Sequence, residues 1–170
     1  PNVLPGQFAM VWIPGINELP MSVMISQESG KAAFTVRKHG LASTGLFNIQ
    51  SGGKIGIRGP YGNAFDIKPG KLLLVGGGTG LVPMMRLLTF LKPTDDVTVL
   101  IGAKSKNEVF FESLANDLLK NNLHKVIVST DDGSYGENGF VTDVVEKLVN
   151  ESHFDAVYTC GPEKMMYKTV

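Results

Sequence analysis

The chain has 170 residues, enough for two small domains, and its 16 basic and 16 acidic residues cancel. That balance gives no overall field that would attract nucleic acid or an anionic membrane, and no apolar run approaches the ~20 residues needed to cross a bilayer. A single cysteine excludes an internal disulfide framework and any four-cysteine metal cluster within these residues. We therefore expect a reduced, cytoplasmic setting, with no nucleic-acid or membrane partner.

The first 69 residues predict a β-rich domain. Short β-forming runs are separated mostly by glycine and proline, a pattern that favours a small antiparallel sheet or barrel. The runs are Phe8–Ile13, Met21–Ser26, Ala32–Val36 and Lys54–Arg58. We place the boundary near Lys68, Pro69 and Gly70, which gives domains of residues 1–69 and 70–170.

The second part of the chain alternates strands with helices. Apolar strand patterns cover residues 71–75, 97–103, 125–129 and 156–159, and helical patterns begin near Pro83 and cover 108–119 and 141–150. This alternation implies right-handed crossovers and a doubly wound parallel sheet with helices on both faces. Ligands of such sheets bind outside the carboxyl ends of the strands, so we look for the site there.

A glycine-rich turn follows the first of these strands. Its members are Gly76, Gly77, Gly78, Thr79 and Gly80. Glycines let backbone amides approach a pyrophosphate, and the start of the next helix points its positive dipole end at the same place. The spacing is not the common G-x-G-x-x-G fingerprint, so a glycine-rich connection without a ligand remains the alternative.

Two further strand ends carry candidate residues. Asp131 and Asp132 follow the third strand, where a carboxylate could accept a hydrogen bond from a ribose 2′-hydroxyl and repel a 2′-phosphate, which favours NAD over NADP. The alternative for this segment is a plain turn. Cys160, Gly161 and Pro162 follow the fourth strand, at the edge where a dinucleotide would lie.

Six segments in order carry a resemblance to the ferredoxin-NAD(P) reductase superfamily. Within it, the chain resembles most the electron-transfer subunits of NAD-dependent dihydroorotate dehydrogenases, through the run from Asp131 to Gly136 followed by Gly139–Asp143. The six segments are residues 5–8, 19–23, 59–65, the glycine run with Pro83, 130–134 and 160–162. The family has a flavin-binding barrel followed by a nicotinamide-binding domain, and the resemblance implies FAD and NAD as cofactors.

The resemblance places the flavin ring on the end of an early strand. The residues carried over to line the isoalloxazine are Pro20, Met21, Ser22 and Val23. Ser22 would hydrogen-bond near the reactive nitrogen, whereas an isolated serine here would simply face water. The family normally has an arginine where this chain has Leu19, and leucine supplies no charge-assisted bond to a flavin phosphate.

A second flavin motif of the family resembles residues 39–46. Here Gly40, Ser43 and Thr44 would offer amides and hydroxyls to the flavin pyrophosphate at the start of a short helix. The alternative is a Ser/Thr helix cap without a ligand.

Cys160 stands where the family places a cysteine facing the nicotinamide and flavin rings. With Ser22 it is a candidate for the catalytic site. Hydride transfer asks the protein for alignment and shielding, so we expect Cys160 to shape the pocket rather than act as a nucleophile. A small apolar filler is the alternative.

The resemblance implies an electron-transfer subunit that moves hydride between NAD(H) and FAD and serves a catalytic partner of the dihydroorotate dehydrogenase type in a hetero-oligomer. The family's two-iron, two-sulfur cluster has no ligands here, since the chain holds one cysteine, and the barrel is expected to be incomplete. A fragment of a longer protein and a relative without its own cluster both fit. Alternatives are a subunit of an NAD-linked hydrogenase, sulfide dehydrogenase or NADH:ferredoxin oxidoreductase, and a flavin-less nucleotide-binding assembly module.

Overall fold

The structure is a computed structural model that describes residues 3–26, 28 and 30–170. It divides into two compact units, one reaching to Phe65 and the other running from Asp66 to Val170. The division lies four residues before the sequence-based boundary. Residues 66–68 belong to the second unit because Tyr158 binds them there: its hydroxyl donates to the carbonyl oxygen of Asp66 at 2.9 Å and accepts from the amide of Lys68 at 2.8 Å.

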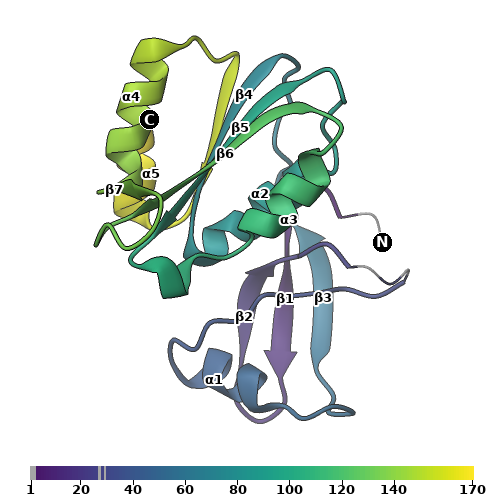
Figure 1. Cartoon of the computed structure of the whole chain (residues 1–170). Coiled ribbons are helices and arrows are strands. Elements are labelled where there is room, and N and C mark those ends of the chain that lie inside the picture. Colours follow the sequence, from purple (N-terminus) through teal and green to yellow (C-terminus); the bar gives the residue numbers. More distant parts are fainter. Residues whose placement is uncertain (1–2, 27, 29) are drawn as a thin grey trace. The chain divides into compact units, whose positions relative to one another are not determined.

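The first unit contains an antiparallel sheet of three strands among the described residues. The strands are β1 (Phe8–Ile13), β2 (Asn17–Ser22) and β3 (Gly56–Tyr61), in the order β2-β1-β3 (Figure 1). A short helix, α1, spans Leu41–Asn48. Along β1 the side chains alternate: Val11 and Ile13 are buried, while Trp12 between them is 51% exposed, as expected for a sheet with one covered face.

Strand β2 begins and ends four residues earlier than the sequence predicted. The sequence placed this strand at Met21–Ser26, but it begins at Asn17 because a tight turn at Gly15 (φ 76°) pairs Ile13 with Asn17. The Ile16 amide donates to the Ile13 carbonyl at 3.0 Å, and this bond closes the turn around Pro14 and Gly15. The run Ala32–Val36 forms only an isolated bridge, between Met24 and Ala33.

The second unit is a parallel sheet of five strands in the order β7-β6-β5-β4-β8. Its strands are β4 (Lys71–Gly77), β5 (Asp96–Ala103), β6 (Leu123–Thr130), β7 (Glu137–Asn138) and β8 (Ala156–Cys160). Figure 1 shows helices α2 (Leu81–Leu88) and α3 (Glu112–Leu119) on one face, with α4 (Val141–Glu151) and α5 (Glu163–Thr169) on the other. The predicted combination of a β unit and a doubly wound α/β unit is confirmed.

Strand β4 lies at the centre of the hydrophobic core. Leu73 and Val75 pack with Val141 and Val145 of α4, and by strand alternation Leu72 and its neighbours on the other side face the opposite layer. A strand buried on both faces needs a continuous apolar run rather than an alternating one. This requirement explains why β4 was easy to recognise in the sequence.

Helix α3 begins later than its pattern suggested. The sequence predicted a helix over residues 108–119, but a short 3₁₀ turn (Lys106–Glu108) ends first, and the helix starts at Glu112. Between them Phe111 takes the left-handed conformation (φ 69°), and its carbonyl accepts the first helical bond from Ala115. The two-residue strand β7 was not predicted at all, since it is too short to leave a pattern.

Two carboxylates close the amino-terminal edge of the sheet. The side chain of Asp95 accepts bonds from the amides of Gly70 (3.1 Å) and Lys92 (2.8 Å), and that of Asp155 accepts one from the amide of Lys71 (2.7 Å). Both therefore stabilise loops at this edge.

In residues 3–26, 28 and 30–170 no helix is both long and apolar enough to span a bilayer.

Two threonines near the strand ends should differ in their contribution to stability. The Thr130 hydroxyl donates to the Tyr135 carbonyl (2.7 Å) and accepts from its amide (3.0 Å), whereas the buried Thr159 hydroxyl has no partner within the described part of the chain. We expect Thr130→Val to lower the free energy of unfolding by about 1–3 kcal/mol, and Thr159→Val to leave it unchanged or raise it. Denaturant titration of both variants tests this, and equal losses would contradict it.

Candidate functional site

The second unit has a topological switch point between β4 and β8. From β4 the chain winds outward through β5 to β6, and it then returns to the other side of β4 to form β8. The two strands run parallel, with Gly76 opposite Cys160 at their carboxyl ends. In open α/β sheets the crevice outside such a pair of strand ends is where ligands bind. The glycine run and Cys160–Pro162, which are distant in sequence, meet here.

The contact that brings them together is backbone against backbone. A Cβ atom added to Gly80 would overlap the carbonyl oxygen of Cys160 and lie 2.6 Å from the Cα atom of Gly161. A Cβ on Gly76 would lie 2.6 Å from a methyl carbon of Leu81, the first residue of α2. Packing alone therefore requires a glycine at position 80 and favours one at position 76, which is compatible with the alternative of a glycine-rich connection without a ligand.

Two more glycines of the site also have packing roles. A Cβ on Gly77 would lie 3.1 Å from the sulfur of Met165 and 3.3 Å from the ring of Pro162. Gly161 has φ 159° and approaches the Gly77 amide. These close approaches bring the main chain of the glycine run and that of Cys160 and Gly161 together at the carboxyl edge of the sheet.

Gly78 is the member of the run with a left-handed backbone, at φ 57°. It opens a 3₁₀ turn, η1 (Gly78–Gly80), which continues directly into α2, so the first amides of this helical segment point out of its start. No acidic residue occurs in the first turn of either segment. The helix dipole and the amides therefore favour an anion here.

The end of β6 resolves the two aspartates into different roles. The Asp132 carboxylate accepts bonds from the Ser134 hydroxyl (2.6 Å) and the Ser134 amide (3.0 Å), and the hydroxyl bond holds the pKa of Asp132 below its ordinary value. Asp131 is exposed, and its carboxylate has no partner among the residues that the structure describes. Asp132 thus forms the turn that the alternative interpretation expected, whereas the Asp131 carboxylate is not used by that turn.

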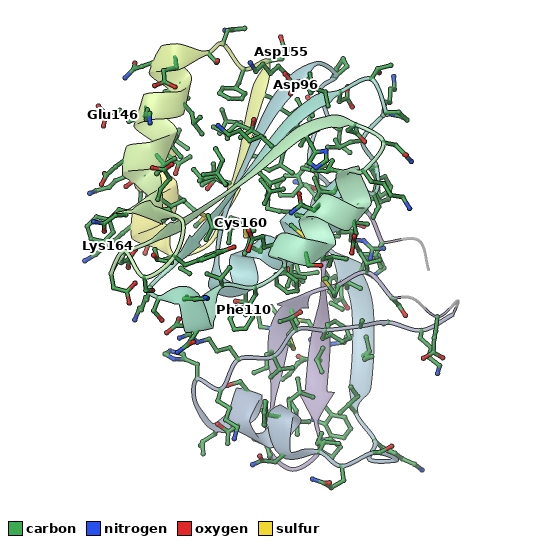
Figure 2. All side chains as sticks on the ribbon, viewed as in Figure 1. Asp96, Phe110, Glu146, Asp155, Cys160 and Lys164 are labelled. Atoms are coloured by element: carbon green, nitrogen blue, oxygen red, sulfur yellow. The ribbon has the colours of Figure 1, made fainter. Side chains whose placement is uncertain are left out.

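Cys160 lies half-buried at the carboxyl end of β8. Figure 2 shows it toward the same end of the sheet as Phe110, with Asp96 and Asp155 at the opposite end. Burial raises the pKa of its thiol, because desolvation disfavours the thiolate. A protonated thiol is a poor nucleophile, which fits a role in shaping the pocket.

The residues expected to line a flavin ring lie at the end of β2 and just after it. Pro20 is exposed, Met21 and Ser22 are partly buried, and Val23 is buried. Ser22 pairs with Phe8 across the sheet, and its partly buried hydroxyl has no hydrogen-bond partner in residues 3–26, 28 and 30–170. It is therefore available to a ligand.

The second expected flavin motif is organised as a helix start. Gly40 precedes α1 with φ 117°, and its carbonyl accepts the Thr44 amide at 3.0 Å. The Ser43 hydroxyl accepts from the His39 amide at 2.8 Å, so it is engaged in a local capping bond. The first-turn amides and the Thr44 hydroxyl, which has no partner among the described residues, remain for a phosphate.

Sequence reasoning missed three polar residues near the carboxyl edge of the sheet: Thr159 in β8, Tyr135 in the loop after β6, and Glu112 at the start of α3. Thr159 adjoins Cys160, and Tyr135 donates to both carboxylate oxygens of Glu112 at 3.1 Å. No periodicity or motif marks these residues.

Within the described ranges, no group of three or more His, Cys, Asp or Glu side chains could hold a metal ion.

The model of the oxidoreductase NAD-binding domain family matches residues 74–170, which include β4, the glycine run and β8. The chain belongs to this family. The matched range contains the whole switch point described above.

Two curated relatives of the chain carry the same description. The chain is 38% identical over 99% of its length to a protein of Thermoplasma volcanium, and 41% identical over 98% to one of Methanocella arvoryzae. Both are named probable dihydroorotate dehydrogenase B (NAD(+)), electron transfer subunit. The chain spans 62% and 60% of the length of these relatives.

Solved structures share the fold. The chain is similar to an NADH-dependent reduced ferredoxin-NADP oxidoreductase studied for flavin-based electron bifurcation, with a TM-score of 0.84, 29% identity, and coverage of 97% of this chain and 60% of that one. It also superposes on the flavohem-like FAD/NAD-binding domain of a Vibrio cholerae nitric oxide dioxygenase. There the TM-score is 0.75 at 18% identity, covering 95% of this chain and 87% of the other, so this likeness concerns the fold alone.

The pKa of Cys160 predicts a slow thiol. Because burial raises that pKa above its ordinary 9.0, iodoacetamide should alkylate the folded NAD-binding unit more slowly at neutral pH than the same chain unfolded in guanidinium. The protonated thiol is the favoured folded form, so its contribution to stability is present below pH 9 and is lost as the pH rises through the raised value. Equal rates in the folded and unfolded chain at neutral pH would contradict this.

Proposed function

We propose that the chain is the flavin- and NAD-binding part of an electron-transfer subunit, and that its partner is a catalytic subunit of the dihydroorotate dehydrogenase type. The observation that carries the proposal is the match over nearly the whole chain to relatives named as that subunit. The switch point between β4 and β8, with its main-chain lining, supports a dinucleotide site in the same chain.

The NAD-binding unit would hold the nicotinamide cofactor along its carboxyl edge. The amides of Gly78, Thr79 and Gly80 would bind the pyrophosphate, because they open a helical segment with no acidic residue nearby in its first turn. Gly76 and Gly77 would keep the main chain close to the ligand. Asp131, rather than Asp132, would accept the bond from the ribose 2′-hydroxyl.

The first unit would hold FAD. Met21 and Val23 would lie against the ring, together with Pro20, while the unpaired Ser22 hydroxyl would donate a hydrogen bond to it. First-turn amides of α1, beginning after Gly40, would bind the flavin phosphates in place of the arginine that Leu19 replaces. The residues present thus fit the ring better than the phosphates.

When both cofactors are bound, they supply hydride exchange between nicotinamide and flavin. The protein's part is to orient them and exclude water. Cys160, half-buried with a raised pKa, would present a neutral thiol beside Gly161 and Pro162. Ser22 would fix the orientation of the flavin through its hydroxyl.

The onward electron path would leave these 170 residues. A two-iron, two-sulfur centre needs several cysteines, and the sequence contains one. We therefore place such a centre outside this stretch, in further sequence or in a partner subunit, and expect a hetero-oligomer in the cytoplasm.

A second candidate is a subunit that couples NADH to ferredoxin. It is favoured by the 29% identity and TM-score of 0.84 to the NADH-dependent reduced ferredoxin-NADP oxidoreductase. A flavin-less assembly module is the remaining alternative, favoured by Leu19 and by the engaged Ser43 hydroxyl.

The visible spectrum of the purified full-length protein separates these candidates. We expect flavin bands that bleach on anaerobic addition of NADH, and dihydroorotate-linked NAD reduction only when the catalytic partner is added. A colourless, folded protein would support the assembly module. Bleaching with ferredoxin reduction and no response to the dihydroorotate partner would support the second candidate.

Gly78 offers a direct test of the pyrophosphate site. Gly78→Glu should abolish measurable NADH binding, because it brings a like charge to the helix start, while its left-handed φ costs the fold only about 1 kcal/mol. The matched control is Gly78→Asn, since asparagine tolerates this backbone without adding a charge. Calorimetry should find NADH bound by the control and not by the glutamate variant; unchanged affinity in both would remove the assignment.

Asp131 should set the choice between cofactors. Asp131→Ser should narrow the preference for NADH over NADPH by about 1–3 kcal/mol, the contribution of a hydrogen bond to a charged group. Asp117→Ser removes an equal charge from the exposed side of α3 and serves as the control. Dissociation constants for both cofactors test this, and equal affinities in the unsubstituted protein would be evidence against it.

A further inference from the structure

The loop that carries Asp131 is built around two fully buried hydroxyls. The Ser129 hydroxyl donates to the carbonyl oxygen of Gly139 at 2.5 Å, and the Thr130 hydroxyl bonds both main-chain groups of Tyr135. These bonds close the chain from the end of β6 to the start of α4 on itself. These bonds shape the base of the loop, where it leaves β6 and where it meets α4.

Glycines make this shape possible. Gly133 and Gly136 have φ values of 69° and 70°, and a Cβ on Gly136 would overlap the carbonyl oxygen of Val128. The loop lies directly on the end of β6, and a side chain at this position would lift it off. Such close packing is more than a plain surface turn requires.

A second set of contacts joins this loop to the connection between β5 and α3. The Lys106 amide donates to the Ser134 hydroxyl at 2.8 Å, and the Lys106 ammonium lies 5.4 Å from the centre of the Tyr135 ring. The Tyr135 hydroxyl donates to both oxygens of Glu112, the first residue of α3. We call the Tyr135–Glu112 pair the latch.

The latch is a hydrogen bond at the protein surface with a charged acceptor. Its acceptor is a carboxylate at a helix start, where the dipole favours negative charge. Hydrogen bonding to Glu112 raises the pKa of Tyr135, so the phenol keeps the proton that it donates. Hydrogen bonds to charged acceptors are about twice as strong as neutral ones.

Asp131 is the first residue of the loop after β6, and its main chain is bonded to the end of β5. Its amide donates to the Ala103 carbonyl at 3.0 Å and the next amide, that of Asp132, donates to the Lys104 carbonyl at 3.2 Å. Its main chain is thereby fixed at the carboxyl ends of β5 and β6. The amides of Asp131 and Asp132 are thus bonded within the protein, whereas the Asp131 carboxylate has no hydrogen-bond partner among the described residues.

We propose that the latch is a specificity-determining positioning pair: by joining α3 to the loop after β6, Tyr135 and Glu112 hold the Asp131 carboxylate where it selects a nicotinamide dinucleotide with an unsubstituted ribose 2′-hydroxyl. This rests on the proposed function, because it deepens the account of the same site. Neither residue touches the reacting atoms. Both act through Asp131, by restricting where its carboxylate can be.

Releasing the latch should change cofactor choice rather than chemistry. A loop with more freedom places Asp131 correctly for a smaller share of the time, which weakens NADH binding. The same freedom lets the carboxylate move away from a 2′-phosphate, which relieves the repulsion of NADPH. The ratio of the two dissociation constants should therefore fall, while turnover at saturating NADH stays the same.

The test measures dissociation constants of NADH and NADPH for four variants of the full-length protein. Tyr135→Phe and Glu112→Ala should each reduce the NADH preference by about three- to tenfold, less than the loss of the Asp131 carboxylate itself, because the pair acts only through it. Glu112→Gln keeps an acceptor oxygen and should retain most of the preference. Tyr167→Phe is the matched control, because Tyr167 is 76% exposed on α5 and should leave both constants unchanged.

The outcomes separate this proposal from the proposed function. A protein that prefers NADH, with the same ratio in Tyr135→Phe and Glu112→Ala, overturns the latch and leaves the function standing. A protein that binds neither dinucleotide overturns the function. Equal loss in Glu112→Ala and Glu112→Gln would show that the charge and not the hydrogen bond matters, and would overturn the latch as a hydrogen-bonded pair; should Tyr135→Phe not fold, the two Glu112 variants decide.

Discussion

The candidate site depends on one contact, the approach of the Gly80 backbone to the backbone of Cys160 and Gly161. No side chain fits between them, since a Cβ on Gly80 would overlap the Cys160 carbonyl oxygen. The contact seats the start of α2 against the end of β8 at the point where the sheet reverses its winding. It thereby places unpaired helix amides and the half-buried thiol of Cys160 at the same edge of the sheet.

The two edges of the parallel sheet use their carboxylates differently. At the amino edge, Asp95 and Asp155 accept bonds from main-chain amides and so hold loops in place. At the carboxyl edge, Asp132 does the same within its own turn, while Asp131 has no partner in the described residues. The Asp131 carboxylate and the first amides of the turn Gly78–Gly80 are thus polar groups that this edge offers to a ligand.

Much of this could be predicted from the sequence, for identifiable reasons. Strand β4 was recognisable because burial on both faces demands an unbroken apolar run, and the glycine run because close backbone contacts exclude side chains. The start of β2 could not be predicted, because a turn at Gly15 sets its register and the strand itself has no strong β pattern. The left-handed Phe111 displaced the start of α3 for a similar reason.

The candidate site was predicted as a set of residues but not as an arrangement. Asp131 and Asp132 are equivalent in a sequence, and only the Ser134 bonds distinguish them. The expected contact of Ser43 with a phosphate stays a prediction, and the sequence did not show that its hydroxyl accepts from the His39 amide. The Tyr135–Glu112 pair joins residues 23 positions apart and leaves no motif. Contacts between side chains of different loops depend on tertiary structure, which no local pattern encodes.

The most direct test of the account is a nitrogen-15 NMR titration of the protein with NAD⁺. If the dinucleotide binds at the switch point between β4 and β8, the largest amide shifts should fall on Gly78–Gly80, Gly161 and Asp131. The amides of Gly70 and Lys71 at the amino edge should stay unchanged, because Asp95 and Asp155 already hold them. Shifts that cluster at the amino edge, or that spare the residues from Gly78 to Gly80, would contradict the central claim.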